Sequence, residues 1–332
     1  MNTQDNHDKI QNNYHGKKIL ITGASGFIGS NLVAYLKQID CQIIRLSRHS
    51  LSPLQKSLAT IHDIIGDIND KTFWHTLFKE HTIDFIFHLA AQINAYSAAQ
   101  HPLEDLQTNI TSLLTLLEEI RYSKTQPDLI FASTATAFGL TPSQPINETH
   151  ADHPITIYDI NKQTAEQYLH FYTSQQWLNT CSLRLPNIYG SINSSKTQGR
   201  GLINNIILQA LKGQDLTIYN DGHYLRDFLY IDDVIHAFLL AGCYTKKAQG
   251  EFFLLGSGQT YTLNDAFELI KQITKEEAGI SINIKHISPP EGASAIEFRH
   301  YLANYQKFTH LTHWTPKYTL HEGLTKLVKQ LL

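Results

Sequence analysis

The sequence has little of several features that define particular classes of protein. It carries three cysteines, Cys41, Cys181 and Cys243, with no C-x-x-C pair, so neither a disulfide framework nor a thiolate zinc site is expected. No run of 18 apolar residues is present, so no membrane span is expected. The net charge is −3, so no cationic face for nucleic acid or for a membrane surface is required. The 18 histidines are scattered without an H-E-x-x-H pattern, and no metal site is expected.

These exclusions leave a globular chain. Its 332 residues, 42% of them hydrophobic, suffice for one large domain or two modest ones. The first 16 residues are polar and mixed in charge, and they lack the apolar stretch of a secretory signal. We therefore expect a cytoplasmic protein in which residues 1–16 form a flexible N-terminal extension.

Short apolar segments alternate with helical patterns through the first half of the chain. Strands are expected at 17–22, 42–46, 83–89 and 129–132, with helices at 27–38 and 106–121. Buried strands separated by helices predict an α/β fold, a Rossmann-type doubly wound parallel sheet. After about Leu185 the loops lengthen and carry Gly, Asn and Pro, which predicts a smaller mixed α/β region.

A glycine pattern joins the first strand to the first helix. Gly23, Gly26 and Gly29 have the spacing that a tight turn, a close backbone approach to a pyrophosphate and tight helix packing require. The N-terminus of the following helix offers unpaired N–H groups to phosphate oxygens. The segment therefore predicts a dinucleotide site.

Two further segments extend this pattern to a known family. One is Gly66-Asp67-Ile68, and the other is His88-Leu89-Ala90-Ala91, at the end of the strand expected at 83–89. With the G-x-x-G-x-x-G turn, they resemble the extended short-chain dehydrogenase/reductase family of nucleotide-sugar epimerases, dehydratases and reductases, over roughly residues 17–330. The resemblance implies that the cofactor is bound by Gly23, Ser25, Gly26, Phe27, Ile28, Gly29, Asp67, Ile68, Leu89, Ala90, Ala91, Tyr158 and Lys162.

The end of the second strand bears on the choice of cofactor. NAD-using members of this family carry an acidic residue there, for the ribose hydroxyls. This chain has Ser47 followed by Arg48, and both side chains are able to bond a 2′-phosphate. NADP(H) is therefore favoured, with NAD(H) as the alternative.

The candidate catalytic residues come from two segments. Tyr158 and Lys162 lie four residues apart and so share one face of a helix. A nearby ammonium favours a phenolate, so Lys162 is expected to lower the pKa of Tyr158. The segment 133–139 resembles the family's S-S-x-x-x-Y-G stretch, which implies that Thr134 is the third catalytic residue, beside Ser133 at the substrate.

The second half carries the substrate motifs of the resemblance. Residues 184–190 resemble the family's R-x-x-N-x-Y-G, in which Asn187 contacts substrate. Tyr219 falls where the family stacks a ring on the nucleobase, and Arg226 is expected to pair with the diphosphate. The later R-x-G-D arginine of many relatives is missing, and Arg299 lies out of register with it.

The two residues after Thr134 narrow the choice of reaction. Dehydratases of the family have Asp-Glu there, whereas this chain has Ala135 and Thr136, so water loss is not expected. The Ala-Thr pair resembles the 4-epimerases, but Ser47 and Arg48 suit an exchangeable NADPH. NADPH-dependent reduction of an NDP-4-keto-6-deoxyhexose is therefore favoured. The alternatives are an NDP-hexose 4-epimerase with tightly bound NAD, and a non-catalytic NADP-binding sensor.

The resemblance also implies how the chain is divided and assembled. We expect a dinucleotide-binding domain over 17–188 plus about 225–258, and a nucleotide-sugar substrate region over 189–224 and 259–332. The helices that follow Pro102 and Tyr158 form a dimer interface in relatives, which implies a homodimer. The expected ligands are a nucleotide sugar and a nicotinamide dinucleotide, without nucleic acid, membrane or metal.

Overall fold

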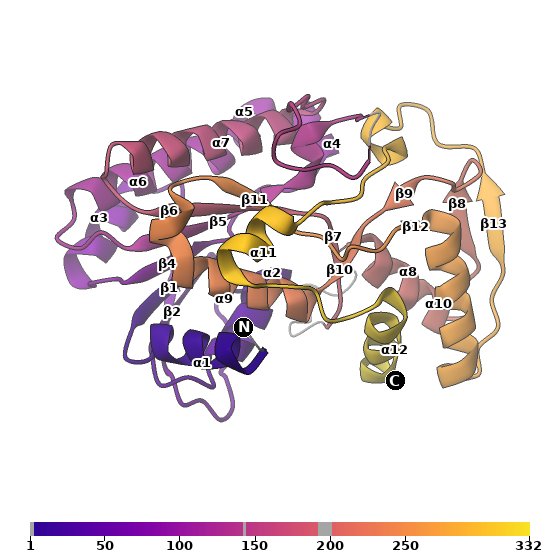
Figure 1. The fold of residues 1–332 in the computed structure, drawn as a ribbon, viewed down its shortest axis with the longest axis horizontal. Coiled ribbons are helices and arrows are strands. Elements are labelled where there is room, and N and C mark those ends of the chain that lie inside the picture. The colour runs from indigo at the N-terminus through magenta and orange to yellow at the C-terminus, as the bar shows by residue number, and fades with distance from the viewer. Residues whose placement is uncertain (1–2, 142–143, 192–200) are drawn as a thin grey trace.

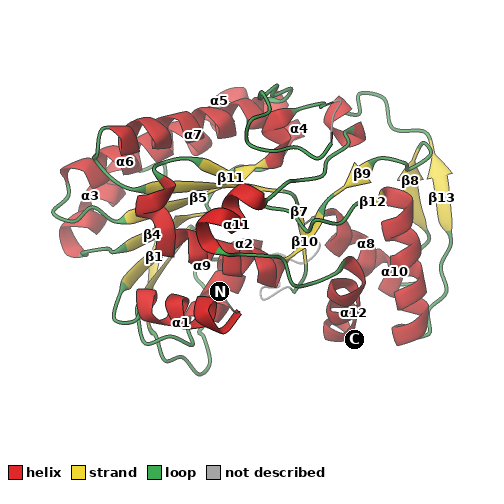
Figure 2. Cartoon of the chain, in the orientation of Figure 1, coloured by secondary structure: helices red, strands yellow, loops and turns green. Residues whose placement is uncertain are grey.

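The computed structural model describes residues 3–141, 144–191 and 201–332. Its centre is a parallel sheet of seven strands in the order β11-β6-β5-β4-β1-β2-β3 (Figures 1 and 2). These strands are β1 (Lys18–Thr22), β2 (Gln42–Ser47), β3 (Thr60–Ile65), β4 (Phe85–His88), β5 (Asp128–Thr134), β6 (Thr180–Leu185) and β11 (Phe252–Leu254). The order reverses between β1 and β4, where doubly wound sheets bind ligands at their carboxyl edge. The Rossmann-type fold predicted from the sequence is confirmed.

Helices cover both faces of this sheet, as the red and yellow layers of Figure 2 show. Successive strand residues point to opposite faces, so Ile19 and Ile21 join the core under one helical layer while Leu20 joins the core under the other. The first layer contains α2 (Phe27–Leu36) and α9 (Ile231–Ala248), and the second contains α3 (Lys71–Glu80), α6 (Ser112–Tyr122) and α7 (Ile157–Ser174). The short helices α4 (Ala95–Gln100) and α5 (Pro102–Leu106), then a π-helical turn at Gln107–Thr111, lead into α6.

The N-terminal segment differs from the expectation. Instead of a flexible extension, the chain forms helix α1 (Thr3–Tyr14), which packs on α9. Ile10 and Tyr14, one helical turn apart, are fully buried, and the Tyr14 hydroxyl donates to the Leu239 carbonyl at 2.8 Å. Tyr14 enters a hollow in α9 at Gly242, where an added Cβ would lie 2.0 Å from the hydroxyl oxygen. Two apolar side chains thus anchor an otherwise polar helix.

The smaller region is built from short two-stranded sheets and three helices. Its elements are β7 (Asn187–Tyr189) paired with β10 (Phe228–Tyr230), β8 (Leu216–Tyr219) with β13 (Ile284–Ile287), β9 (Leu225–Arg226) with β12 (Tyr261–Thr262), and helices α8 (Leu202–Leu211), α10 (Leu263–Ala278) and α12 (Leu320–Leu331). Capping boxes begin α10 at Thr262 and α12 at Thr319. Helix α11 (Gln306–Thr312), expected in this region, lies instead against α9 and β11 of the larger one (Figure 1).

Candidate active site

The glycine turn after β1 forms one wall of a pocket of about 530 Å³. Gly23 has φ +66°, and a Cβ there would lie 2.9 Å from the Ala90 nitrogen, so the turn and the end of β4 are in close backbone contact. Gly26 is the N-cap of α2 and provides no side-chain cap, which leaves the first N–H groups of the helix available to an anion. Among the described residues that line the pocket are Gly23, Ser25, Gly26, Ser47, Arg48, Asp67, Ile68, Leu89, Ala90 and Ala91.

Of the expected cofactor residues, Tyr158 and Lys162 on α7 lie outside the lining of this pocket, and so do three residues at the start of α2. Phe27 and Ile28 pack against the hydrophobic core beside α2. Gly29 instead permits close packing, because a Cβ there would lie 2.3 Å from the Gly23 carbonyl oxygen. Their part in the site is to hold the helix N-terminus in place.

The rim beyond β2 carries the two residues that bear on cofactor choice. Ser47 is buried and its hydroxyl donates to that of Ser25 at 3.3 Å, whereas Arg48 is exposed. The neighbouring Arg45 is instead paired with Asp63, which accepts two of its hydrogen bonds at 2.6 Å each. Arg48 is thus the arginine of this strand end that lines the pocket.

Thr22 and His88, which sequence reasoning did not single out for this role, hold the opposite wall. The Thr22 hydroxyl accepts hydrogen bonds from the Leu89 and Ala90 N–H groups, both at 3.0 Å, so its own hydrogen is free to reach His88 Nδ1 at 3.2 Å. Burial, and then the positive charge of Lys162, lowers the pKa of His88 to about 3. The imidazole is therefore neutral and acts as an acceptor that fixes the loop through Thr22.

The expected catalytic residues come together beside β5. Thr156 caps α7 by accepting from the Asp159 N–H, which starts the helix so that Tyr158 and Lys162 lie on its first turns. Thr134 ends β5 and forms a side-chain hydrogen bond with Tyr158. Lys162 is buried, and its Nζ lies 6.0 Å from the centre of the Tyr158 ring. The predicted trio is thus assembled at the carboxyl edge of the sheet.

The electrostatics of the trio differ from the expectation that Lys162 lowers the tyrosine pKa. Burial, followed by the charges of Asp159 and Asp105, raises the pKa of Tyr158 well above its usual value. Burial lowers the pKa of Lys162 to about 8, against the raising effect of Asp105 and Glu166. The Lys162 ammonium donates to the Ala132 carbonyl at 2.9 Å. Tyr158 is therefore protonated at neutral pH in the unliganded site.

Asp105 organises the floor below this trio and was not found from the sequence. It is fully buried and accepts from Asn161 at 2.6 Å, from Asn109 at 3.1 Å and from Gln92 at 2.9 Å. The network ties the π-helical turn and the loop after β4 to α7. No local pattern reveals it, because its members are spread over about 70 residues of sequence.

The expected substrate residues are divided by the structure. Ser133 is buried beside Glu166, and strand alternation directs it to the face opposite Thr134, so it does not join the trio. The Asn187 amide donates to the Asp227 carbonyl at 3.5 Å. Tyr219 on β8 is 39% exposed, as a ring that receives a ligand needs to be.

Arg226 lies beside Arg299, a contact that the sequence motifs did not predict. Its guanidinium donates to the carbonyls of Glu297, at 2.6 Å, and of Arg299. Burial and then the charge of Arg299 lower the pKa of Arg226 to about 9. Among the described residues neither arginine forms a carboxylate ion pair, although the charge of Glu297 acts on both, and that of Asp159 of α7 acts on Arg299. Two cations thus lie together near the catalytic helix, and no ion pair within the described chain neutralises them.

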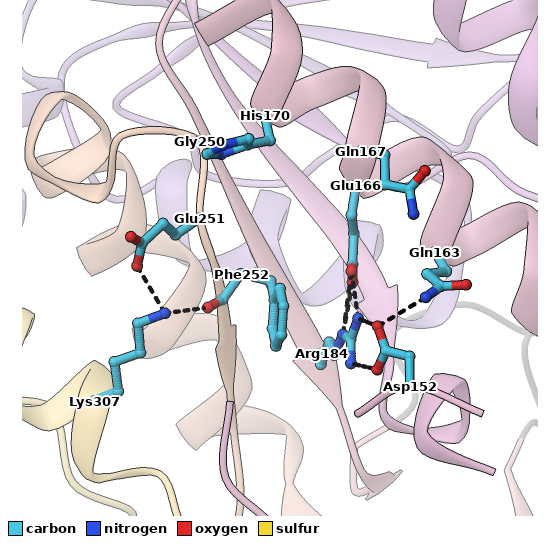
Figure 3. A pocket seen from close by; sticks show the side chains of 10 residues that line it. All are labelled: Asp152, Gln163, Glu166, Gln167, His170, Arg184, Gly250, Glu251, Phe252 and Lys307. Carbon is cyan, nitrogen blue, oxygen red and sulfur yellow. Dashed lines mark hydrogen bonds and ion pairs between the residues drawn. The ribbon is translucent and has the colours of Figure 1, made fainter. Parts of the chain in front are cut away.

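Arg184, the first residue of the R-x-x-N segment, is held away from the trio. Figure 3 shows it between Asp152 and Glu166 in a separate pocket of about 440 Å³. Its guanidinium donates to Glu166 at 2.6 Å and to Asp152 at 2.7 Å, and it stacks 3.7 Å from the centre of the Phe252 ring. Because both carboxylates are satisfied by this arginine, the arrangement joins β6, α7 and β11 as a structural unit.

The fold and pocket define a Rossmann-type dinucleotide-binding protein. The chain belongs to the NAD dependent epimerase/dehydratase family, whose model matches residues 19–256. The resemblance to extended short-chain dehydrogenase/reductases of the nucleotide-sugar type is therefore confirmed. Within the described residues, no helix has the length and apolar character needed to cross a membrane.

Similar proteins bear on the choice between 4-epimerisation and reduction of a 4-keto sugar. The chain is 29% identical to a putative UDP-glucose 4-epimerase of Methanocaldococcus jannaschii, covering 93% of this chain and 97% of that protein. It is 28% identical to UDP-glucuronate 4-epimerase 4 of Arabidopsis thaliana, over 96% of this chain and 76% of the relative. A UDP-glucose 4-epimerase of Thermotoga maritima, solved with UDP-glucose, superposes with a TM-score of 0.80 at 30% identity, covering 95% and 98% of the two chains.

These relatives support the 4-epimerase alternative better than the net reduction favoured by the sequence. The family description also specifies NAD, and the NADP(H) preference inferred from Ser47 and Arg48 finds no support in it.

Proposed function

We propose that this protein is an NAD-dependent UDP-hexose 4-epimerase. The observation that carries the proposal is the assembly of Tyr158, Lys162 and Thr134 at the carboxyl edge of β5, together with the 4-epimerase relatives. The absence of an acidic pair after Thr134 agrees with it, since nothing at those two positions is placed to remove water from the sugar.

The residues of this chain have distinct parts in the proposed chemistry. Bound NAD would supply a reversible hydride acceptor, and its residues would be those lining the pocket at Gly23, Gly26 and Asp67. Tyr158 exchanges a proton with the C4 oxygen of the sugar, and Thr134 orients that oxygen. Burial and two carboxylates raise the pKa of Tyr158, so a further positive charge near its oxygen favours the phenolate that accepts this proton. Inversion at C4 requires that the oxidised sugar present its other face before it is reduced.

The arginine pair supports a nucleoside diphosphate substrate. A buried guanidinium is stabilised by an anion, and the pKa of Arg226 is lowered first by its burial and then by the charge of Arg299. A diphosphate carries enough negative charge to neutralise both. Arg299 thus takes the place of the second phosphate contact that the missing R-x-G-D arginine left open.

The apolar surface of the second helical layer supports a homodimer. Tyr122 on α6 and Ile160, Tyr168 and Phe171 on α7 are exposed. Exposed apolar patches of this kind mark protein interfaces. Sedimentation equilibrium on the wild type and on a variant with arginine at Phe171 tests this assembly, and a monomeric wild type would contradict it. The cytoplasmic location expected from the sequence stays a prediction.

The reaction is tested with the purified protein and NAD. We expect UDP-glucose and UDP-galactose, or the corresponding UDP-uronates, to interconvert by NMR without net change in reduced nicotinamide. Consumption of NADPH by a nucleotide 4-keto sugar, without interconversion of any UDP-hexose, would establish the reductase instead. Biological function undiminished by Tyr158→Phe would support the non-catalytic sensor.

A further inference from the structure

Asp105 is a buried carboxylate that pairs with no cation. It is fully buried on α5, which packs against the catalytic helix α7 (Figure 1). None of the ion pairs within the described chain includes it. Its partners are the side-chain amides of Gln92, Asn109 and Asn161. A buried anion without a cation is costly, so a positive charge that enters nearby is stabilised.

The hydrogen bonds around Asp105 hold it as an anion. The side-chain oxygen of Gln92 accepts the Asn94 N–H, so the amide nitrogen of Gln92 is the atom that points to the carboxylate. Asn109 is oriented in the same way, because its side-chain oxygen accepts the Gln92 N–H at 3.2 Å. Both amides therefore give hydrogens to Asp105, and a protonated carboxyl would find no acceptor in either of them.

This anion lies between the dinucleotide pocket and the catalytic residues. Gln92, which donates to Asp105 at 2.9 Å, lines the pocket. Asn161, which donates to it at 2.6 Å, lies on α7 between Tyr158 and Lys162. The charge of Asp105 acts on both of these catalytic side chains. The proposed chemistry needs the nicotinamide and Tyr158 at the same sugar carbon, so this charge reaches the nicotinamide as well.

We propose that Asp105 makes the site bind NAD⁺ more tightly than NADH. The nicotinamide ring is positively charged when oxidised and neutral when reduced, so a fixed anion nearby stabilises the oxidised form alone. During 4-epimerisation this bias favours the return of hydride to the oxidised sugar, and little NADH accumulates. The inference rests on the proposed function, and within it on NAD as the cofactor.

Two pairs of variants separate the charge of Asp105 from its hydrogen bonds. Asp105→Asn removes the charge and keeps the shape. Asp128→Asn is its matched control, because Asp128 also accepts from a side-chain amide, that of Asn179 at 2.8 Å, but at the amino end of β5. Gln92→Lys keeps the carboxylate and brings an ammonium beside it, so it tests the charge even where Asp105→Asn folds poorly. Gln92→Met removes the same hydrogen bond without adding a charge.

The measured quantity is the oxidation state of the bound cofactor. Each protein is equilibrated with an equimolar excess of NAD⁺ and NADH, free nucleotide is removed by rapid gel filtration, and bound NADH is quantified by its absorbance. At about pH 6, below the pKa of about 8 of Lys162, this ammonium stays charged in every variant. We expect the bound ratio of NAD⁺ to NADH to fall about tenfold in Asp105→Asn and Gln92→Lys, which is about 30 mV for a two-electron couple. It should change less than about twofold in Asp128→Asn and Gln92→Met.

A second measurement follows the cofactor during turnover. With saturating UDP-glucose, the fraction of enzyme that absorbs as reduced nicotinamide should be higher in Asp105→Asn and Gln92→Lys than in the wild type and the two controls. This readout requires the sugar reaction, whereas the bound ratio requires only the cofactor site.

The outcomes distinguish the inference from the function on which it rests. An unchanged bound ratio in Asp105→Asn and Gln92→Lys overturns the inference alone. An equal change in the two controls also overturns it, since that result would show damage to the pocket and not an effect of charge. A wild type that binds neither dinucleotide overturns the inference together with the cofactor of the proposed function. The expected ratios without interconversion of any UDP-hexose would support the inference and overturn the proposed 4-epimerase.

Discussion

Replacing Arg299 with methionine separates phosphate recognition from structural support. The change removes the partly buried member of two adjacent cations and keeps a side chain of similar length. We expect the affinity for UDP to fall about 30-fold, because a charge-assisted hydrogen bond to phosphate is worth about 2 kcal/mol. The affinity for uridine, which has no phosphate, should hardly change. Isothermal titration calorimetry with both ligands measures the difference.

The same variant should not destabilise the unliganded protein. The charge of Arg299 opposes that of Arg226, whose pKa is lowered to about 9, and relief of this repulsion offsets the lost bond from Arg299 to the Ile296 carbonyl. The free energy of unfolding should therefore stay within about 1 kcal/mol of the wild type. Lys246→Met, at an exposed position on α9, controls for the loss of a charge. Equal weakening of UDP and uridine, or a large loss of stability, would refute the phosphate role.

Three further predictions concern other parts of the molecule. Tyr158→Phe should reduce kcat by about 10²- to 10⁴-fold with NAD affinity retained, since it removes only the proton carrier; fluorescence titration of NAD checks the second half. Gly242→Ala should lower the free energy of unfolding in urea by about 1–3 kcal/mol, because its Cβ meets the Tyr14 hydroxyl. Gly213→Ala is the comparison: its Cβ meets one described atom within 4 Å, at 3.9 Å, and its φ is +72°, so it reports the cost of backbone strain alone. Folded Lys162 has a pKa of about 8 against 10.5, so the unfolded state binds more protons between these values and stability gains with rising pH. Relative to Lys162→Met, the wild type should gain up to about 3 kcal/mol from pH 8 to 10.5, and a flat difference would contradict the lowered pKa.

Local patterns predicted four of the seven strands of the described central sheet, and the motif residues, for a physical reason. Each of the four predicted strands contains a short apolar run, whereas β3, with Thr60, His62 and Asp63 exposed, does not and was missed. Gly26 and Gly29 face contacts within their own turn. Tyr158 and Lys162 are paired by helix geometry alone. Such features are encoded within a few residues, so a single sequence reveals them.

Features that depend on distant contacts were not predictable in this way. The sequence of helix α1 is typical of a polar extension. Its two buried residues, Ile10 and Tyr14, hold it in place only because Gly242 of α9 leaves room for Tyr14. Arg299 became important only when a loop brought it beside Arg226. Whether the pKa of Tyr158 is raised or lowered also depends on its burial and on Asp105, which lies 53 residues earlier in the chain. These effects arise from tertiary packing, which spacing does not encode.

The position of β11 has a consequence for the order of folding. This strand lies at one edge of the central sheet beside β6, yet about 70 residues of sequence separate the two. Until β11 is made, the backbone groups on that side of β6 have no partner, and an unpaired edge invites association with other chains. The sheet therefore closes only after α8, β8 and α9 have been synthesised. Substitutions that slow the folding of the smaller region should thus reveal themselves as aggregation through β6, even though they lie outside the sheet.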